Sequence, residues 1–142
     1  MVDSGIKPNS DITTAFNELK IERSIRCLVL KIDKTNTGLE IDFKEDKTTF
    51  NYNELAEKLP KDDPRFVLVD FEYETNENPP RKTSKLILFF WCPDISKINR
   101  KVVFSSTKHS VKTALTGIQK DLQASDYSDL DYENVRKEML RP

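Results

Sequence analysis

The side chains most suited to chemistry in this sequence are the basic ones between Ile95 and Lys120, a stretch that contains no Asp or Glu. Cationic groups with no carboxylate between them are suited to docking onto an acidic partner. The chain as a whole has a formal net charge of −1 at pH 7, so this stretch is locally polarised within a near-neutral protein. Its basic residues are Lys97, Arg100, Lys101, Lys108, Lys112 and Lys120.

These side chains must be positioned by a helix, because apolar residues recur every three to four positions through the same stretch. Pro93 and Asp94 can open a helix, and Gly117 is its expected end, with a bend near Ser105 and Ser106. On such a helix Lys101, Lys108 and Lys112 fall within about 40° of one another, about 100° from the apolar stripe. We therefore predict a basic ridge beside a buried face. The alternative is a solvated helix face that is basic without binding anything. The apolar stripe of the predicted helix consists of Val103 or Phe104, Thr107, Val111, Ala114 or Leu115, and Ile118.

Catalytic and metal-binding constellations do not stand out elsewhere in the chain. His109 is the one histidine, and no Asp, Cys or second His is spaced to form a site with it. Cys27 and Cys92 lie in apolar runs without metal-ligand spacing, so we expect free thiols. The three glycines form no phosphate-binding loop. We predict no enzymatic activity, no cofactor and no metal, and the pI of about 5.9 disfavours nucleic-acid binding.

The length of 142 residues predicts one domain over 1–142, with residues 1–8 flexible. The longest apolar run, Leu86 to Cys92, is too short for a transmembrane helix, and the amino terminus lacks the apolar core of a secretory signal. We expect a cytoplasmic protein; no strong basic cluster drives nuclear import, although entry with a partner stays open.

Sequence patterns predict helices and strands along the whole chain. A helix capped at Asn9, Ser10 or Asp11 runs to Lys20, and a short helix near Asn51 stops near Pro60. Period-2 alternation and apolar runs predict strands, and "DLDYENVRKEML" predicts a closing amphipathic helix. The predicted strands are "RCLVLKID", "GLEIDFKE", "RFVLVDFEYE", "SKLILFFWC", which is apolar on both faces and so expected to be central, and "GIQKDLQAS".

Four stretches resemble the ADF/cofilin proteins of the actin-depolymerising factor homology family. They are "DSGI", "KLPKDDPRFVLVDFEYE", "SKLILFFWCPD" and "KVVFSSTKHSVKTALTGIQKDLQASD", which match in order and spacing together with "TAFNELK". The resemblance implies an α/β fold of the α+β type, with a central mixed sheet of five or six strands flanked by helices on both faces. It also implies a monomer that binds actin monomers and filaments, prefers ADP-actin, and promotes filament disassembly and severing.

The resemblance also implies two binding surfaces. Binding of the actin monomer is expected at Ser4, Gly5, Arg100, Lys101, Lys108, His109 and Lys112, with Ser4 a candidate for regulatory phosphorylation. Filament binding is expected at Arg81, Lys82, Lys85, Lys137 and Arg141. The carboxyl-terminal "NVRKEMLRP" departs from the usual charge order, which makes filament binding less secure than monomer binding.

Phosphoinositides are a second expected ligand of the basic ridge. Three alternatives stay open: a mainly monomer-binding factor with weak severing, a coactosin-like relative and a glia-maturation-factor-like relative. Failure to bind monomeric actin would favour the last two.

Overall fold

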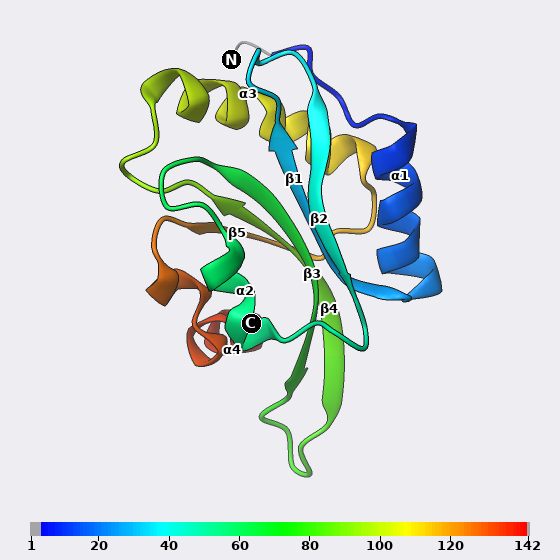
Figure 1. Cartoon of the computed structure of the whole chain (residues 1–142). Helices are drawn as coiled ribbons and strands as arrows, with labels where there is room; N and C mark the ends of the chain where they lie inside the picture. Colours follow the sequence, from blue (N-terminus) through cyan, green and yellow to red (C-terminus); the bar gives the residue numbers. More distant parts are fainter. Residues whose placement is uncertain (1–3, 142) are drawn as a thin grey trace.

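The computed structural model describes residues 4–141 and shows a sheet of five strands with helices on both of its faces (Figure 1). The strands lie in the order β2-β1-β3-β4-β5, antiparallel except for the parallel pair β4 and β5. The predicted fold class and all five predicted strands are therefore confirmed. The strands are β1 (Ile25–Ile32), β2 (Leu39–Asp46), β3 (Arg65–Glu74), β4 (Lys82–Trp91) and β5 (Lys120–Ala124).

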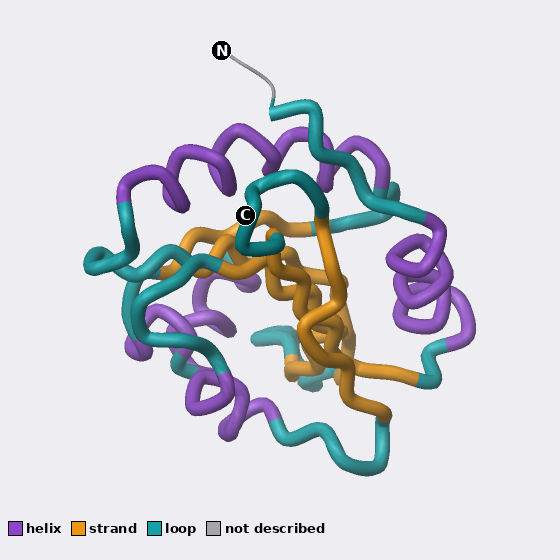
Figure 2. Tube along the Cα trace, turned by 45° about the horizontal axis from the view of Figure 1, so that its top comes forward, coloured by secondary structure: helices purple, strands orange, loops and turns teal. Residues whose placement is uncertain are grey.

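Helices cover both faces of this sheet, as the trace in Figure 2 shows. α1 (Ser10–Asn17), which continues into a π-helical turn (Glu18–Glu22), and α3 (Ile98–Ala114) pack on one face. The short α2 (Tyr52–Leu55), its 3₁₀ extension (Ala56–Lys58), a second 3₁₀ turn (Tyr127–Leu130) and α4 (Tyr132–Leu140) lie on the other. The sheet is thus the middle of three layers.

The interior strands are apolar at consecutive positions because both of their faces are covered. In β1, Leu28 and Leu30 pack toward α1 and α3, whereas Cys27 and Val29 pack toward α2 and α4. All four side chains are completely buried. β4 has the same pattern and lies between β3 and β5, so its predicted interior position is confirmed.

Side-chain caps set the starts of three helices. The Asn9 carboxamide accepts a hydrogen bond from the Ile12 N–H (3.0 Å), and Asn51 accepts from the Asn53 N–H (3.0 Å). Asp131 accepts from the Asn134 N–H at the start of α4 (3.3 Å). These oxygens satisfy N–H groups that have no partner within the helix.

α3 is shorter at both ends than the sequence predicted. After Pro93 the chain makes a turn closed by the Ser96 N–H and the Pro93 carbonyl (3.1 Å), so the helix begins at Ile98 rather than at Pro93 or Asp94. It ends at Ala114, and Gly117, with φ of 107°, belongs to the reversal that follows. The expected end at Gly117 was therefore wrong by about one helical turn.

The β3–β4 hairpin projects beyond the rest of the sheet, at the bottom of Figure 1. β1 pairs with β3 only over Phe66–Val69, and β5 pairs with β4 only over Ile87–Trp91. From Asp70 to Leu86 the hairpin is therefore a two-stranded ribbon without a third strand.

Candidate functional site

The outward face of α3 carries an apolar line that the sequence patterns had not indicated. Ile98 and Val102, which form this apolar line, are 79% and 58% exposed, and Ile95 in the turn before the helix is 75% exposed. On a helix, Ile98, Val102 and His109 fall within about 40° of one another, on the side opposite the buried Thr107. Ile95, Ile98 and Val102 are spaced by three and four residues, and this spacing is the signal in the sequence for the exposed line. The buried apolar stripe of the same helix is a longer pattern and obscured that signal. Exposed large apolar side chains in one line are typical of protein-binding surfaces.

The predicted basic ridge lies along one side of this apolar line. Lys108 and Lys112 both pair with the Asp121 carboxylate of β5, at 3.4 Å and 2.8 Å. The Lys108 ammonium also lies 5.8 Å from the centre of the Phe90 ring, and Lys101 donates to the Asp94 carbonyl (2.6 Å). The three lysines are thus brought together, but each has a partner within the protein. The ridge therefore has a lower net charge than the sequence of α3 alone implies.

Arg100, which was expected at the binding surface, is directed into the protein instead. Its guanidinium donates five hydrogen bonds: two to the Asp63 carboxylate (2.9 and 3.0 Å), two to the carbonyls of Ile32 and Asp33 (2.7 Å each) and one to Asn36 (2.8 Å). All five N–H groups of the side chain are used, and the side chain is 14% exposed. These bonds attach α3 to the β1–β2 turn, and the expected contact of Arg100 with a partner stays a prediction.

The amino-terminal segment is attached to the middle of α3. The Thr107 hydroxyl donates to the Val103 carbonyl (2.6 Å), which leaves its oxygen to accept from the Ser4 hydroxyl (2.6 Å). The Ile6 N–H donates in turn to Ser4 Oγ (3.2 Å), and the Ile6 side chain is 4% exposed in the core. Ser4 and Ile6 are thus attached to the rest of the protein, and the expected flexibility of residues 1–8 stays a prediction. Residues 1–3 lie outside the described part of the chain.

Gly5 lies next to this attachment and has φ of 78°. This left-handed backbone conformation favours glycine, and it turns the chain between Ser4 and the buried Ile6. Ser4 and Gly5 therefore lie beside α3 at Thr107, and their expected joint action with the lysines stays a prediction.

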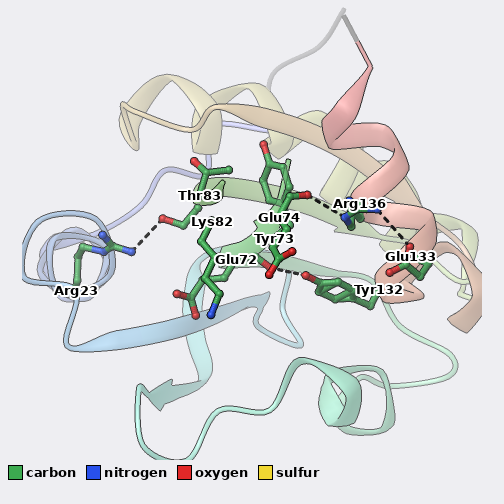
Figure 3. Close-up of a pocket in the computed structure, with 10 residues that line it drawn as sticks. Arg23, Glu72, Tyr73, Glu74, Lys82, Thr83, Tyr132, Glu133 and Arg136 are labelled. Carbon is green, nitrogen blue, oxygen red and sulfur yellow. Dashed lines mark hydrogen bonds and ion pairs between the residues drawn. The ribbon is translucent and has the colours of Figure 1, made fainter. Parts of the chain in front are cut away.

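The residues expected to bind filaments are distributed over three places. Arg81 and Lys82 lie at the end of the hairpin, and Lys82 lines a hollow of about 610 Å³ between the hairpin and α4 (Figure 3). Lys85 faces a different hollow, beside α1 and Gly117. Lys137 and Arg141 line a third, between β5 and α4. The basic side chain of α4 that donates to the hairpin is Arg136, which the sequence had not singled out.

Two hydrogen bonds join α4 to the hairpin across the hollow in Figure 3. The Tyr132 hydroxyl donates to the Glu72 carbonyl (2.8 Å), and Arg136 Nε donates to the Glu74 carbonyl (3.0 Å). Burial raises the pKa of Tyr132 above its ordinary value, although the nearby Arg136 opposes the shift. The phenol therefore remains a donor at neutral pH.

Among residues 4–141, no group of His, Cys, Asp or Glu is arranged to hold a metal ion. Cys27 and Cys92 are both free thiols, and burial raises the pKa of each. Within the same range, no helix is long and apolar enough to cross a membrane. The features that remain are surfaces: the outward face of α3 with the adjacent Ser4, and the hairpin with α4.

The chain is similar to known proteins in both sequence and fold. A family model described as "Cofilin/tropomyosin-type actin-binding protein" matches residues 5–140. Cofilin of Yarrowia lipolytica is 37% identical over 141 residues, covering 99% of this chain and 90% of that protein. Actin-depolymerizing factor 1 of Arabidopsis thaliana is 35% identical over 133 residues, covering 94% of each. The crystal structure of Streptomyces griseoflavus cofilin superposes with a TM-score of 0.83 at 28% identity, covering 94% of this chain and 96% of that one.

Proposed function

Because the chain belongs to the family of cofilin/tropomyosin-type actin-binding proteins, we propose that it binds actin and promotes the disassembly of actin filaments, with α3 as its principal contact. The observation that carries this proposal is the exposed apolar line of α3, which lies beside lysines and the attached amino-terminal segment. Its action is non-catalytic. Binding of one filament twist or nucleotide state in preference to another shifts the population toward the favoured state.

The apolar line supplies most of the binding free energy at α3. Ile98 is 79% exposed, and full burial of such a side chain contributes about 1.5–3 kcal/mol. Lys101, Lys108 and Lys112 flank the line and fix its orientation against an acidic surface of actin. His109 lies on the line itself, so it contacts the partner directly.

Ser4 is placed to regulate this contact. A phosphate at Ser4 adds a charge of about −1.5 to −2 beside α3, next to an acidic partner. It also replaces the hydroxyl proton that Ser4 donates to Thr107. Phosphorylation would therefore repel actin and detach the amino-terminal segment at the same time.

The filament is contacted through a second surface, made by the hairpin and α4. Arg81 and Lys82 lie on the hairpin, Lys137 lies on α4, and Arg141 directly follows the last residue of that helix. We place Lys85 outside this surface because it faces the hollow beside α1. The protein acts as a monomer in the cytoplasm, where severing follows from the altered filament twist.

Phosphoinositide headgroups are a further ligand of the α3 lysines. Their phosphates compete with actin for the same ammonium groups. Because Asp121 already pairs with two of these lysines, the affinity for such headgroups is moderate at physiological salt.

The test is sedimentation of actin filaments with increasing protein, with measurement of the protein in the pellet and the actin in the supernatant. Ile98→Ala/Val102→Ala removes the apolar line, and Lys108→Ala/Lys112→Ala removes the ridge. Ile21→Ala is the matched control, because Ile21 is 68% exposed but lies at the end of the π-helical turn after α1. We expect wild type and control to pellet and to release actin, and both double variants to fail.

Other outcomes separate the alternatives. Released actin with almost no pelleted protein would indicate a factor that acts mainly on monomers. Pelleting without any binding to monomers would instead favour a coactosin-like activity. If the wild-type protein binds neither monomers nor filaments, the proposed function is wrong.

A further inference from the structure

The ribbon formed by the outer half of β3 and β4 requires a support that the sheet does not provide. β3 has no neighbour on its β1 side beyond Val69, and β4 has no neighbour on its β5 side before Ile87. A two-stranded ribbon in water is only marginally stable by itself. Backbone groups on its edges are also left without strand partners.

α4 supplies this support on the β3 edge. Carbonyl groups of alternate residues in a strand point to the same side, and those of Glu72 and Glu74 point away from β4. Tyr132 and Arg136, one helical turn apart on α4, donate to these two carbonyls in succession. Figure 3 shows the two side chains reaching the strand from the same helix. The spacing of the two donors, one turn of α4, therefore matches the spacing of the two acceptor carbonyls, two residues along β3.

α4 itself is firmly held. Val135 is 1% exposed in the core beneath the sheet, and the preceding Leu130 is 4% exposed. The Tyr132 ring packs against Phe71 and Tyr52, with centroid distances of 5.0 Å and 6.0 Å. The helix is thus a rigid base. The Phe71 ring contact holds the start of the ribbon, and the two donors fix the direction in which its outer part projects.

We propose that Tyr132 and Arg136 are positioning residues that fix the hairpin relative to α4, so that the cations of the hairpin are held in a defined position relative to those at α4 when the protein binds an actin filament. This inference rests on the proposed function. Without these bonds Arg81 and Lys82 would move independently of Lys137 and Arg141. Filament binding would then require the ribbon to be ordered during association, at a cost in affinity.

The decisive variant is Tyr132→Phe, which removes one hydroxyl and keeps the ring contacts and the charge. Arg136→Lys keeps the positive charge while losing the guanidinium Nε donor. Tyr127→Phe is the matched control, because the Tyr127 hydroxyl makes no hydrogen bond within the described residues and its ring stacks on Trp91 at 5.7 Å. The double variant Tyr132→Phe/Arg136→Lys removes both original bonds.

Two readouts are needed. NMR order parameters of the backbone amides from 72 to 84 report the mobility of the ribbon. Filament and monomer affinities, measured separately, report its consequence. Loss of one such hydrogen bond lowers the ratio of docked to undocked ribbon about two- to tenfold, and the two losses multiply in the double variant. We expect lower order parameters confined to the ribbon, and a filament affinity reduced several-fold at unchanged monomer affinity.

The inference is overturned if the double variant keeps wild-type order parameters in the ribbon. It is also overturned if the ribbon becomes mobile while filament affinity stays unchanged, or if monomer and filament affinities fall together. If the wild-type protein does not bind filaments at all, the proposed function fails. The order parameters then still decide whether α4 anchors the ribbon.

Discussion

Replacement of Arg100 by methionine separates a structural role from a binding role for this side chain. Met has a similar length and an apolar stem, but it carries no donors. The substitution leaves the Asp63 carboxylate with Arg65 as its remaining cation, and it leaves the carbonyls of Ile32 and Asp33 without the guanidinium. We expect a large loss of stability, with actin binding by the folded protein unchanged.

The magnitude follows from the burial of the network. Removal of one partner of a buried ion pair costs about 3–5 kcal/mol, because the other charge stays buried without compensation. Asp63 is 23% exposed and keeps Arg65, which reduces this cost. Loss of the hydrogen bonds to the backbone carbonyls adds to it. The free energy of unfolding should therefore fall by about 2–4 kcal/mol.

The pH dependence gives a second signature of the same network. Burial by itself would raise the pKa of Asp63, but hydrogen bonds from Arg100 and Arg65 outweigh it and lower the pKa below its ordinary value. The stabilisation is therefore complete above the unfolded-state pKa of about 4 and is lost as the pH falls through the lower folded-state pKa. The difference between wild type and Arg100→Met should be largest at neutral pH and should shrink in acid.

Urea denaturation followed by the fluorescence of Trp91, the single tryptophan, measures this free energy. Lys97→Met is the control, because Lys97 is exposed and makes no ion pair or side-chain hydrogen bond within the described residues. Monomer affinity is measured in parallel at a temperature at which the variant is folded. The reasoning is refuted if Arg100→Met unfolds within about 0.5 kcal/mol of wild type, the usual range for surface substitutions, but has lost monomer binding.

Three further substitutions test the α3 surface. Thr107→Val should increase hydrogen exchange at the Ile6 amide about two- to tenfold and weaken monomer binding, whereas Thr107→Ser should retain wild-type behaviour in both assays. Asp121→Asn should raise the affinity for vesicles containing phosphatidylinositol bisphosphate and steepen its salt dependence; an unchanged salt dependence would show that Asp121 does not neutralise the ridge. His109→Ala should weaken monomer binding, because His109 lies on the apolar line; an unchanged affinity in a monomer titration would show that this side chain makes no contact with the partner.

Most of the fold was predictable because its signals are local. The alternation in β1 and β2, the two-sided burial of β4 and the caps at Asn9 and Asn51 depend on residues close together in the sequence. The start of α3 was not predictable in this way, because the chain after Pro93 first makes the turn closed by the Ser96 N–H. The exposure of Ile98 and Val102 was also missed, although both are apolar. A pattern that assumes apolar residues to be buried assigns such positions to the wrong face.

The surface was predictable in part, for a related reason. The lysines of α3 share a face because of helix geometry, which the spacing reveals. Their partner Asp121 lies beside them because β5 runs parallel to β4, and Asp63 reaches Arg100 across 37 residues of sequence. These long-range pairings decide which cations face outward. Spacing along one element contains no information about them.

The same pairings determine how α3 can recognise a partner. The buried Phe104 and Val111, the Ser4–Thr107 hydrogen bond and the Arg100 network all hold the inner face of the helix, so that Ile98 and Val102 project from a rigid element. A rigid apolar line loses little conformational entropy on binding. Asp121 meanwhile offsets part of the charge of the ridge. Affinity at this surface should therefore depend more on the burial of the apolar line than on charge, and salt should weaken monomer binding less than the substitution of Ile98 and Val102 does.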